Sequence, residues 1–173
     1  VEGADSYPSH NIFYLFAGIA FMELEDFNNA LIMLETGKSF AIGEGGIKTD
    51  FKVSLAELFY KRGEYSASDK VVDEVLITEP NNATALNNYA YFLSKRKTRL
   101  SDAETMVLKA IELEGGNASF YDTYGWVLFS KGEYDKAISN FNLALDLDAD
   151  SAEIIEHKAD AYYKNGDVEK AIE

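Results

Sequence analysis

Residues 118–151 read ASFYDTYGWVLFSKGEYDKAISNFNLALDLDADS, a stretch of 34 residues whose pattern recurs on both sides of it. Large apolar residues such as Phe141 recur at helical spacing, and the small residues Gly125 and Ala137 stand among them. Small side chains allow two helices to cross closely. The Lys-Gly-Glu sequence at residues 131–133 would end one helix and begin the next, because glycine accepts the left-handed conformation that commonly ends a helix. The stretch therefore predicts a pair of antiparallel helices.

Small residues recur at equivalent positions along the whole chain. In the first helix of each predicted pair they are Gly18, Ala56, Ala90, Gly125 and Ala159. In the second helix of each pair they are Ala30, Ser68, Ala103, Ala137 and Ala171. A fixed period of this length is typical of helical-repeat proteins, in which each helix pair stacks on its neighbours.

The period divides the chain into repeats. Complete repeats are predicted at residues 11–44, 49–82, 83–117 and 118–151, and the third has one extra residue in its turn. Residues 45–48 are predicted to be a glycine-rich insertion. Residues 1–10 resemble the tail of a preceding repeat, with an inter-repeat turn at residues 7–10. Residues 152–173 are predicted to be a repeat cut short in a second helix that begins at Asp167. We therefore expect a fragment of a longer array.

Composition excludes several classes of function. Hydrophobic residues make up 47% of the chain and only two residues are proline, which favours a folded domain over a disordered one. Thirty acidic and sixteen basic residues give a net charge of −14, which disfavours binding to nucleic acid. Without cysteine there is no disulfide and no thiolate nucleophile. The longest apolar run, residues 12–22, is too short to cross a membrane, so we predict no direct membrane insertion.

These features resemble the tetratricopeptide repeat (TPR) family, which has a 34-residue period and a helix-turn-helix unit. The resemblance implies an all-α fold, a right-handed α-solenoid of antiparallel helix pairs whose first helices line a concave, peptide-binding groove. The stretch LNNYAY at residues 86–91 is similar to bacterial repeat proteins, some of which are exported. We therefore expect a bacterial protein that is located in the cytoplasm or the cell envelope, and we favour the cell envelope.

In this family the second, fifth, ninth, twelfth and thirteenth residues of each repeat face the groove. These positions, with one neighbouring asparagine, give the candidate groove residues Tyr60, Lys61, Asn87, Asn88, Tyr91, Lys95, Asp122, Trp126 and Phe129. Asparagine amides can bond the backbone of an extended peptide, and large aromatic rings often anchor binding. Trp126 is the principal candidate anchor. Alternatively, Trp126 packs in the core against the next repeat, and Tyr60 and Phe129 pack beside Phe59 and Leu128.

The same positions in the first complete repeat are mostly apolar. They form a predicted apolar wall of Ile12, Leu15, Ile19 and Met22. One explanation is a ligand or self-association surface, and the other is that preceding repeats or the curvature of the superhelix cover the wall. One TPR subclass holds the C-terminal carboxylate of chaperones with a lysine at the fifth position of the repeat. That position here is Leu15, Val53, Asn87, Asp122 and Glu156, which disfavours this activity.

The sequence offers little catalytic chemistry. His10 lies in the predicted turn at residues 7–10, and His157 lies at helical spacing from Glu153, Glu156 and Asp160. His157 and these acidic residues could form a weak metal or acid-base site, but the favoured interpretation is that His157 is a surface histidine with no functional role. We therefore predict a non-enzymatic scaffold that needs no metal or cofactor and binds an unidentified protein or peptide. The alternative is a structural or self-association module that uses the apolar wall.

Overall fold

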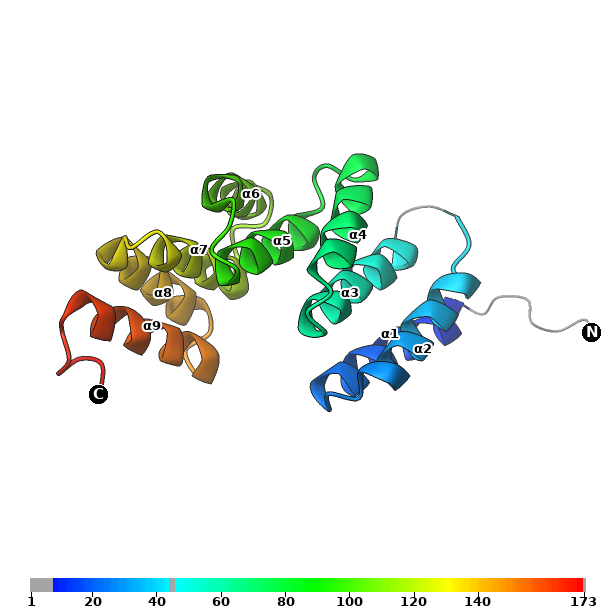
Figure 1. Cartoon of the computed structure of the whole chain (residues 1–173), viewed down its shortest axis with the longest axis horizontal. Coiled ribbons are helices and arrows are strands. Elements are labelled where there is room, and N and C mark those ends of the chain that lie inside the picture. The colour runs from blue at the N-terminus through cyan, green and yellow to red at the C-terminus, as the bar shows by residue number, and fades with distance from the viewer. Residues whose placement is uncertain (1–7, 44–45, 173) are drawn as a thin grey trace, which may run out of the picture. The chain divides into compact units, whose positions relative to one another are not determined.

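The computed structural model describes residues 8–43 and 46–172 (Figure 1), and within them the chain is helical with no strand. The helices of this part are α1 (Pro8–Glu23), α2 (Phe27–Phe40), α3 (Ile47–Lys61), α4 (Tyr65–Thr78), α5 (Ala83–Lys95), α6 (Leu100–Leu113), α7 (Ala118–Ser130), α8 (Tyr134–Leu147) and α9 (Ala152–Asn165). Consecutive helices pack as antiparallel pairs, which confirms the predicted all-α class. None of these helices has the length and apolarity that crossing a membrane requires.

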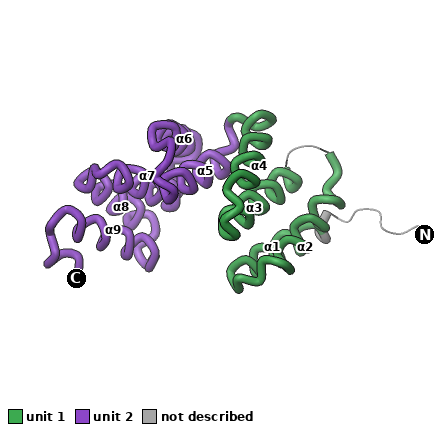
Figure 2. Tube along the Cα trace, in the orientation of Figure 1, with its two compact units in different colours: residues 1–80 green, residues 81–173 purple. Residues whose placement is uncertain are grey.

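The chain divides into two compact units (Figure 2), residues 1–80 and residues 81–173. In the first unit α1 packs on α2, α3 packs on α4, and α3 also contacts both helices of the α1–α2 pair. In the second unit α5 packs on α6 and α7 packs on α8. Helix α7 contacts both α5 and α6, and α9 contacts both α7 and α8. Within each unit, therefore, the first helix of one pair lies against the pair before it.

Close helix crossings account for the small residues of the repeat. A methyl group added at Gly125 would lie 2.5 Å from Cε1 of Phe141, whose ring is fully buried on α8. At Gly18, an added methyl group would lie 2.5 Å from Cδ2 of Leu34 on α2. At each glycine, therefore, a large apolar side chain from the second helix of the same pair packs directly against the backbone.

The turns within pairs require left-handed backbone. Gly63 and Gly132 have φ values of +77° and +82°, a region that favours glycine. The turn with the extra residue has no glycine, and Lys97 and Arg99 adopt φ values of 52° and 48° there. Arg99 donates to Asp102 at 2.8 Å and to the Tyr89 hydroxyl at 3.1 Å, which helps to hold this less favourable turn.

Three helix boundaries differ from those predicted. Residues 8–10 begin α1 and place His10 in that helix, not in a turn, because proline is well suited to the first turn of a helix. Helix α3 begins at Ile47, inside the predicted insertion 45–48. Residues 168–171 form turns and not a second helix. A segment this short needs packing to offset helix nucleation, and its Val168 is exposed. The predicted helical tail in residues 1–6 lies outside the described residues.

We expect the substitution Gly125→Ala to destabilise the chain by on the order of 1 kcal/mol. Overpacking a core typically costs about 1–3 kcal/mol, which exceeds the gain of up to about 1 kcal/mol in helix propensity. The matched control is Gly116→Ala, because an added methyl group there meets nothing within 4 Å. Urea denaturation measures the free energy of unfolding of both variants. An unchanged or raised denaturation midpoint for Gly125→Ala would contradict the packing described.

Candidate functional site

The second unit brings together polar and aromatic side chains from three first helices. We call this surface the α5–α7–α9 face. Its members are Asn87, Asn88, Tyr91 and Lys95 on α5, Asp122, Trp126 and Phe129 on α7, and His157 on α9. Helix α7 contacts α5 on one side and α9 on the other, so one repeat period separates neighbouring rows of the face. Ring, cation–ring and hydrogen-bond contacts that involve Lys95, Trp126 and His157 join five of the predicted groove residues, Tyr91, Lys95, Asp122, Trp126 and Phe129.

Trp126 is at the centre of the face. Its ring stacks on Phe129, with ring centroids 4.7 Å apart and planes 13° apart. The ammonium group of Lys95 lies 4.3 Å from the centroid of the Trp126 ring and 5.5 Å from that of Tyr91. A cation over an aromatic face is attracted by the ring quadrupole. Lys95 therefore links the aromatic residues of α5 to those of α7.

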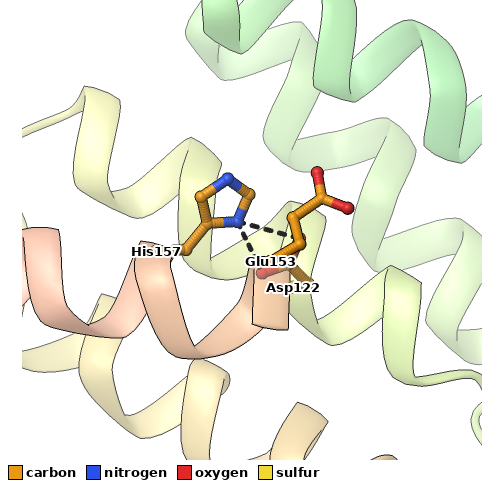
Figure 3. Close-up of side chains that lie close together, drawn as sticks. All are labelled: Asp122, Glu153 and His157. Atoms are coloured by element: carbon orange, nitrogen blue, oxygen red, sulfur yellow. Dashed lines mark hydrogen bonds and ion pairs between the residues drawn. The ribbon is translucent and has the colours of Figure 1, made fainter. Parts of the chain in front are cut away.

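His157 has an unexpected place in this face. It is only 6% exposed, and its Nδ1 lies 2.9 Å and 3.1 Å from the two carboxylate oxygens of Asp122, which is 7% exposed (Figure 3). The imidazole centroid is 4.3 Å from that of Trp126 and 5.9 Å from that of Phe141. His157 is therefore not the surface residue that the sequence interpretation favoured.

The prediction that His157 lies at the surface was wrong for an identifiable reason. The sequence interpretation compared His157 with carboxylates on its own helix, whereas its partner Asp122 is 35 positions earlier, close to one repeat period. Asp122 and His157 are the fifth and sixth residues of successive repeats. Aligning the repeats places Asp122 opposite Glu156, one position before His157, and successive first helices are in contact.

Two polar atoms of the face are buried without a hydrogen-bond partner among the described residues. They are Oδ1 of Asn87 and Nε1 of Trp126. Asn87 is 6% exposed, and its amide nitrogen donates to Oδ1 of Asn88 at 3.4 Å. A buried polar group left unsatisfied costs about 1–3 kcal/mol. The face thus contains one acceptor and one donor whose hydrogen-bonding capacity is not used.

Tyr60 and Lys61 lie on α3 in the first unit. The Tyr60 ring packs against Tyr65 on α4, with centroids 5.5 Å apart, and not only beside its neighbour Phe59. Lys61 Nζ lies 3.3 Å from Glu23 and 3.8 Å from Glu57. The pKa of the Glu57 carboxyl is raised above its ordinary value, mainly because the group is buried. The positive charge of Lys61 lowers this pKa in part, and the negative charge of Glu23 raises it further.

The predicted apolar wall does not form one surface. Leu15 and Met22 lie in the core formed with α2 and α3, and Ile19 packs partly against that core. Ile12 alone among the four is exposed. The exposed face of α1 lies next to this row and carries Phe13, Phe16 and Ala20. We call these three residues, with Leu24 directly after the helix, the α1 stripe. The prediction selected a row of α1 that points largely into the helix pair.

Stacked antiparallel helix pairs with turn glycines and small residues at their crossings define a helical-repeat scaffold. Residues 125–166 match a family model described as "TPR repeat". The "TPR repeat-containing protein PA4667" of Pseudomonas aeruginosa is 34% identical over 73 residues, which are 42% of this chain and 12% of that protein. Mitochondrial import receptor subunit TOM70 of Rattus norvegicus is 27% identical over 92 residues, 53% of this chain and 15% of that protein. The matched part is thus a small share of these relatives.

Solved structures share the fold. TTC0263, a thermophilic TPR protein in Thermus thermophilus, superposes with a TM-score of 0.80 at 20% identity, covering 94% of this chain and 86% of that one. The pilF structure from Pseudomonas aeruginosa gives a TM-score of 0.75 at 22% identity, covering 95% and 73%. The chain thus contains a match to the TPR repeat at residues 125–166 and shares the fold of solved TPR proteins. TPR repeats commonly serve protein–protein interaction, and proteins of this family are typically non-catalytic scaffolds.

We expect His157→Ala to destabilise the chain by about 3 kcal/mol, because removing one partner of a buried pair leaves the other charge or dipole uncompensated. Urea denaturation of His157→Ala, Asp122→Ala and the double variant forms a double-mutant cycle. The double variant should lose clearly less stability than the two single losses added together. Strict additivity would show that the two side chains do not interact.

Proposed function

We propose that the chain is a non-enzymatic scaffold that binds an extended peptide or protein segment on the α5–α7–α9 face. The observation that carries the proposal is the assembly of Lys95, Trp126 and Phe129, a cation and two stacked rings drawn from two repeats. Clustered aromatic residues with a neighbouring positive charge are common binding anchors. The family match supports a protein partner in general terms.

The contacts around Trp126 favour binding with little loss of freedom. Its ring is held between Lys95, Phe129 and His157, so it needs little ordering when a ligand arrives. We propose that an apolar or aromatic side chain of the partner packs on Trp126 and Phe129.

The asparagines would hold the backbone of the partner. Asn87 has an unused acceptor, and the amide of Asn88 lies beside it. An asparagine amide can accept from a peptide N–H and donate to a peptide C=O, which fixes an extended segment without selecting its sequence. The aromatic residues would then supply the selectivity.

Tyr60 and Lys61 are proposed to form a separate contact surface on the first unit. Lys61 would exchange its contacts with Glu23 and Glu57 for contacts with the partner. Ion pairs that are open to solvent contribute only about 0–1 kcal/mol, so this exchange costs little.

We expect Trp126→Ala to weaken partner binding by roughly 30-fold, the loss typical of an anchor worth about 2 kcal/mol. Peptides selected from a random library on the full chain provide the probe, and fluorescence anisotropy provides the affinity. The control is Leu143→Ala, because Leu143 is exposed on the second helix α8. Circular dichroism checks that both variants keep their helicity. Equal losses for the two variants, or no loss for Trp126→Ala, would reject Trp126 as the anchor.

The α1 stripe supports a second function, self-association. In the later first helices the third residue of the repeat is buried, as Phe51, Phe120 and Ile154 show, whereas the equivalent Phe13 is 66% exposed. Helix α3 packs on the α1–α2 pair, and an added methyl group at Gly37 of α2 would clash with the Phe51 ring. The bare face of α1 therefore matches the face that α3 buries against the preceding pair.

The proposed occupant of the α1 stripe is a second copy of this chain. The other end of the chain exposes apolar side chains on α8 and α9, among them Leu147, Ile155 and Tyr163. Packing of these helices on the α1 stripe would be a head-to-tail contact between different surfaces. Such contacts build rings or open filaments and not two-fold symmetric dimers.

We expect the chain to associate with increasing concentration, and Phe16→Glu to weaken this association at least tenfold. A charge placed in an apolar contact must be desolvated without a partner. Analytical ultracentrifugation measures the effect, and Ile32→Glu on α2, equally exposed but outside the α1 stripe, is the matched control. A chain that stays monomeric at all concentrations would exclude self-association through this surface.

A further inference from the structure

Three side chains that can ligate a metal meet where α7 and α9 pack together. Glu153 and His157 are four residues apart, so both project from one face of α9. Asp122 reaches them from α7 (Figure 3). One ligand atom from each residue lies within 4.8 Å of the ligand atoms of the other two. We call this group the carboxylate–imidazole cluster.

The burial of the cluster distinguishes it from ordinary surface carboxylates. Asp122 and His157 are more than nine-tenths buried, whereas Glu153 is exposed. Both carboxylate oxygens of Asp122 lie within hydrogen-bond distance of the same atom, Nδ1 of His157. A carboxylate has about four lone-pair sites, and one N–H can satisfy only part of that capacity. The buried carboxylate of Asp122 therefore has lone pairs that can still coordinate a cation.

We propose that the carboxylate–imidazole cluster binds one divalent transition-metal ion of the Zn²⁺ type. The ligands are Nδ1 of His157 and one carboxylate oxygen each from Asp122 and Glu153. The ion displaces the hydrogen-bond proton between His157 and Asp122, which is released to solvent, and its two positive charges balance the two carboxylates. An imidazole ligand suits Zn²⁺ and Co²⁺, whereas Ca²⁺ and Mg²⁺ prefer sets made of oxygen alone.

The observed distances are close to those of a metal site. Ligands that lie about 2.0–2.1 Å from a tetrahedral ion are roughly 3.3 Å apart. Nδ1 of His157 is 2.9 Å and 3.1 Å from the Asp122 oxygens, so the carboxylate must turn outward by a few tenths of an ångström. The exposed side chain of Glu153 can rotate to complete the set and leaves the ion a path from solvent. A fourth position stays open for water or for a group of a partner.

Surrounding side chains support the orientation of the imidazole. The Trp126 ring lies 4.3 Å and the Phe141 ring 5.9 Å from it, centroid to centroid. Residues that pack around metal ligands fix their direction and exclude water. Trp126 is also the only tryptophan of the chain, so its fluorescence reports on this position alone.

The test is titration of the tag-free full chain with Zn²⁺ by calorimetry and with Co²⁺ by absorption and tryptophan fluorescence. The expected results are one Zn²⁺ per chain, visible absorption of bound Co²⁺, and a change in Trp126 emission that Zn²⁺ reverses. Glu153→Gln should weaken Zn²⁺ binding at least about tenfold, because it removes a ligand at an exposed position that the fold does not need. Glu156→Gln, exposed on the same helix and outside the cluster, should leave it unchanged.

His157→Gln gives a second arm of the test, with circular dichroism to confirm the fold. The folded variant should lose Zn²⁺ binding and the Co²⁺ absorption. No binding of Zn²⁺ by the wild-type chain would overturn the proposal. So would equal binding by Glu153→Gln and Glu156→Gln, or Ca²⁺ binding as tight as that of Zn²⁺, since either result would indicate scattered surface carboxylates.

Discussion

The contact between Gly125 and the buried ring of Phe141 is the constraint on which the second unit depends. Because the glycine has no side chain, α7 and α8 approach closely enough for the ring to fill the space between them. The tight pair then presents its first helix to the neighbouring pairs, so α7 touches α5 before it and α9 after it. Residues one repeat apart become neighbours in space.

The candidate site follows from that arrangement. Lys95 and His157 are each 31 positions from Trp126, and both lie against its ring. No single helix could bring these three groups together. The same stacking places Asp122 beside His157 and gives the face a buried polar pair next to the partly buried Trp126. Recognition of a partner and binding of a metal would thus use adjacent parts of one surface.

The sequence predicted the helix pairs because the small residues and turn glycines recur with a fixed period, and those signals are local. It also placed Trp126 among the groove candidates, which the structure gathers on one face in the second unit. It misplaced His157, since the decisive neighbour is one repeat away and not one helical turn away. It assigned Leu15 to a wall because position in the repeat does not distinguish a surface from a core when the curvature of each pair is unknown.

Contact between residues one repeat apart on the α5–α7–α9 face can be measured directly, because the chain has a single tryptophan. Nuclear Overhauser spectra of the full chain can record the protons near the Trp126 indole. Contact across the repeats predicts cross-peaks both to the side-chain methylenes of Lys95 and to the imidazole of His157. Cross-peaks confined to residues of α7 would contradict it.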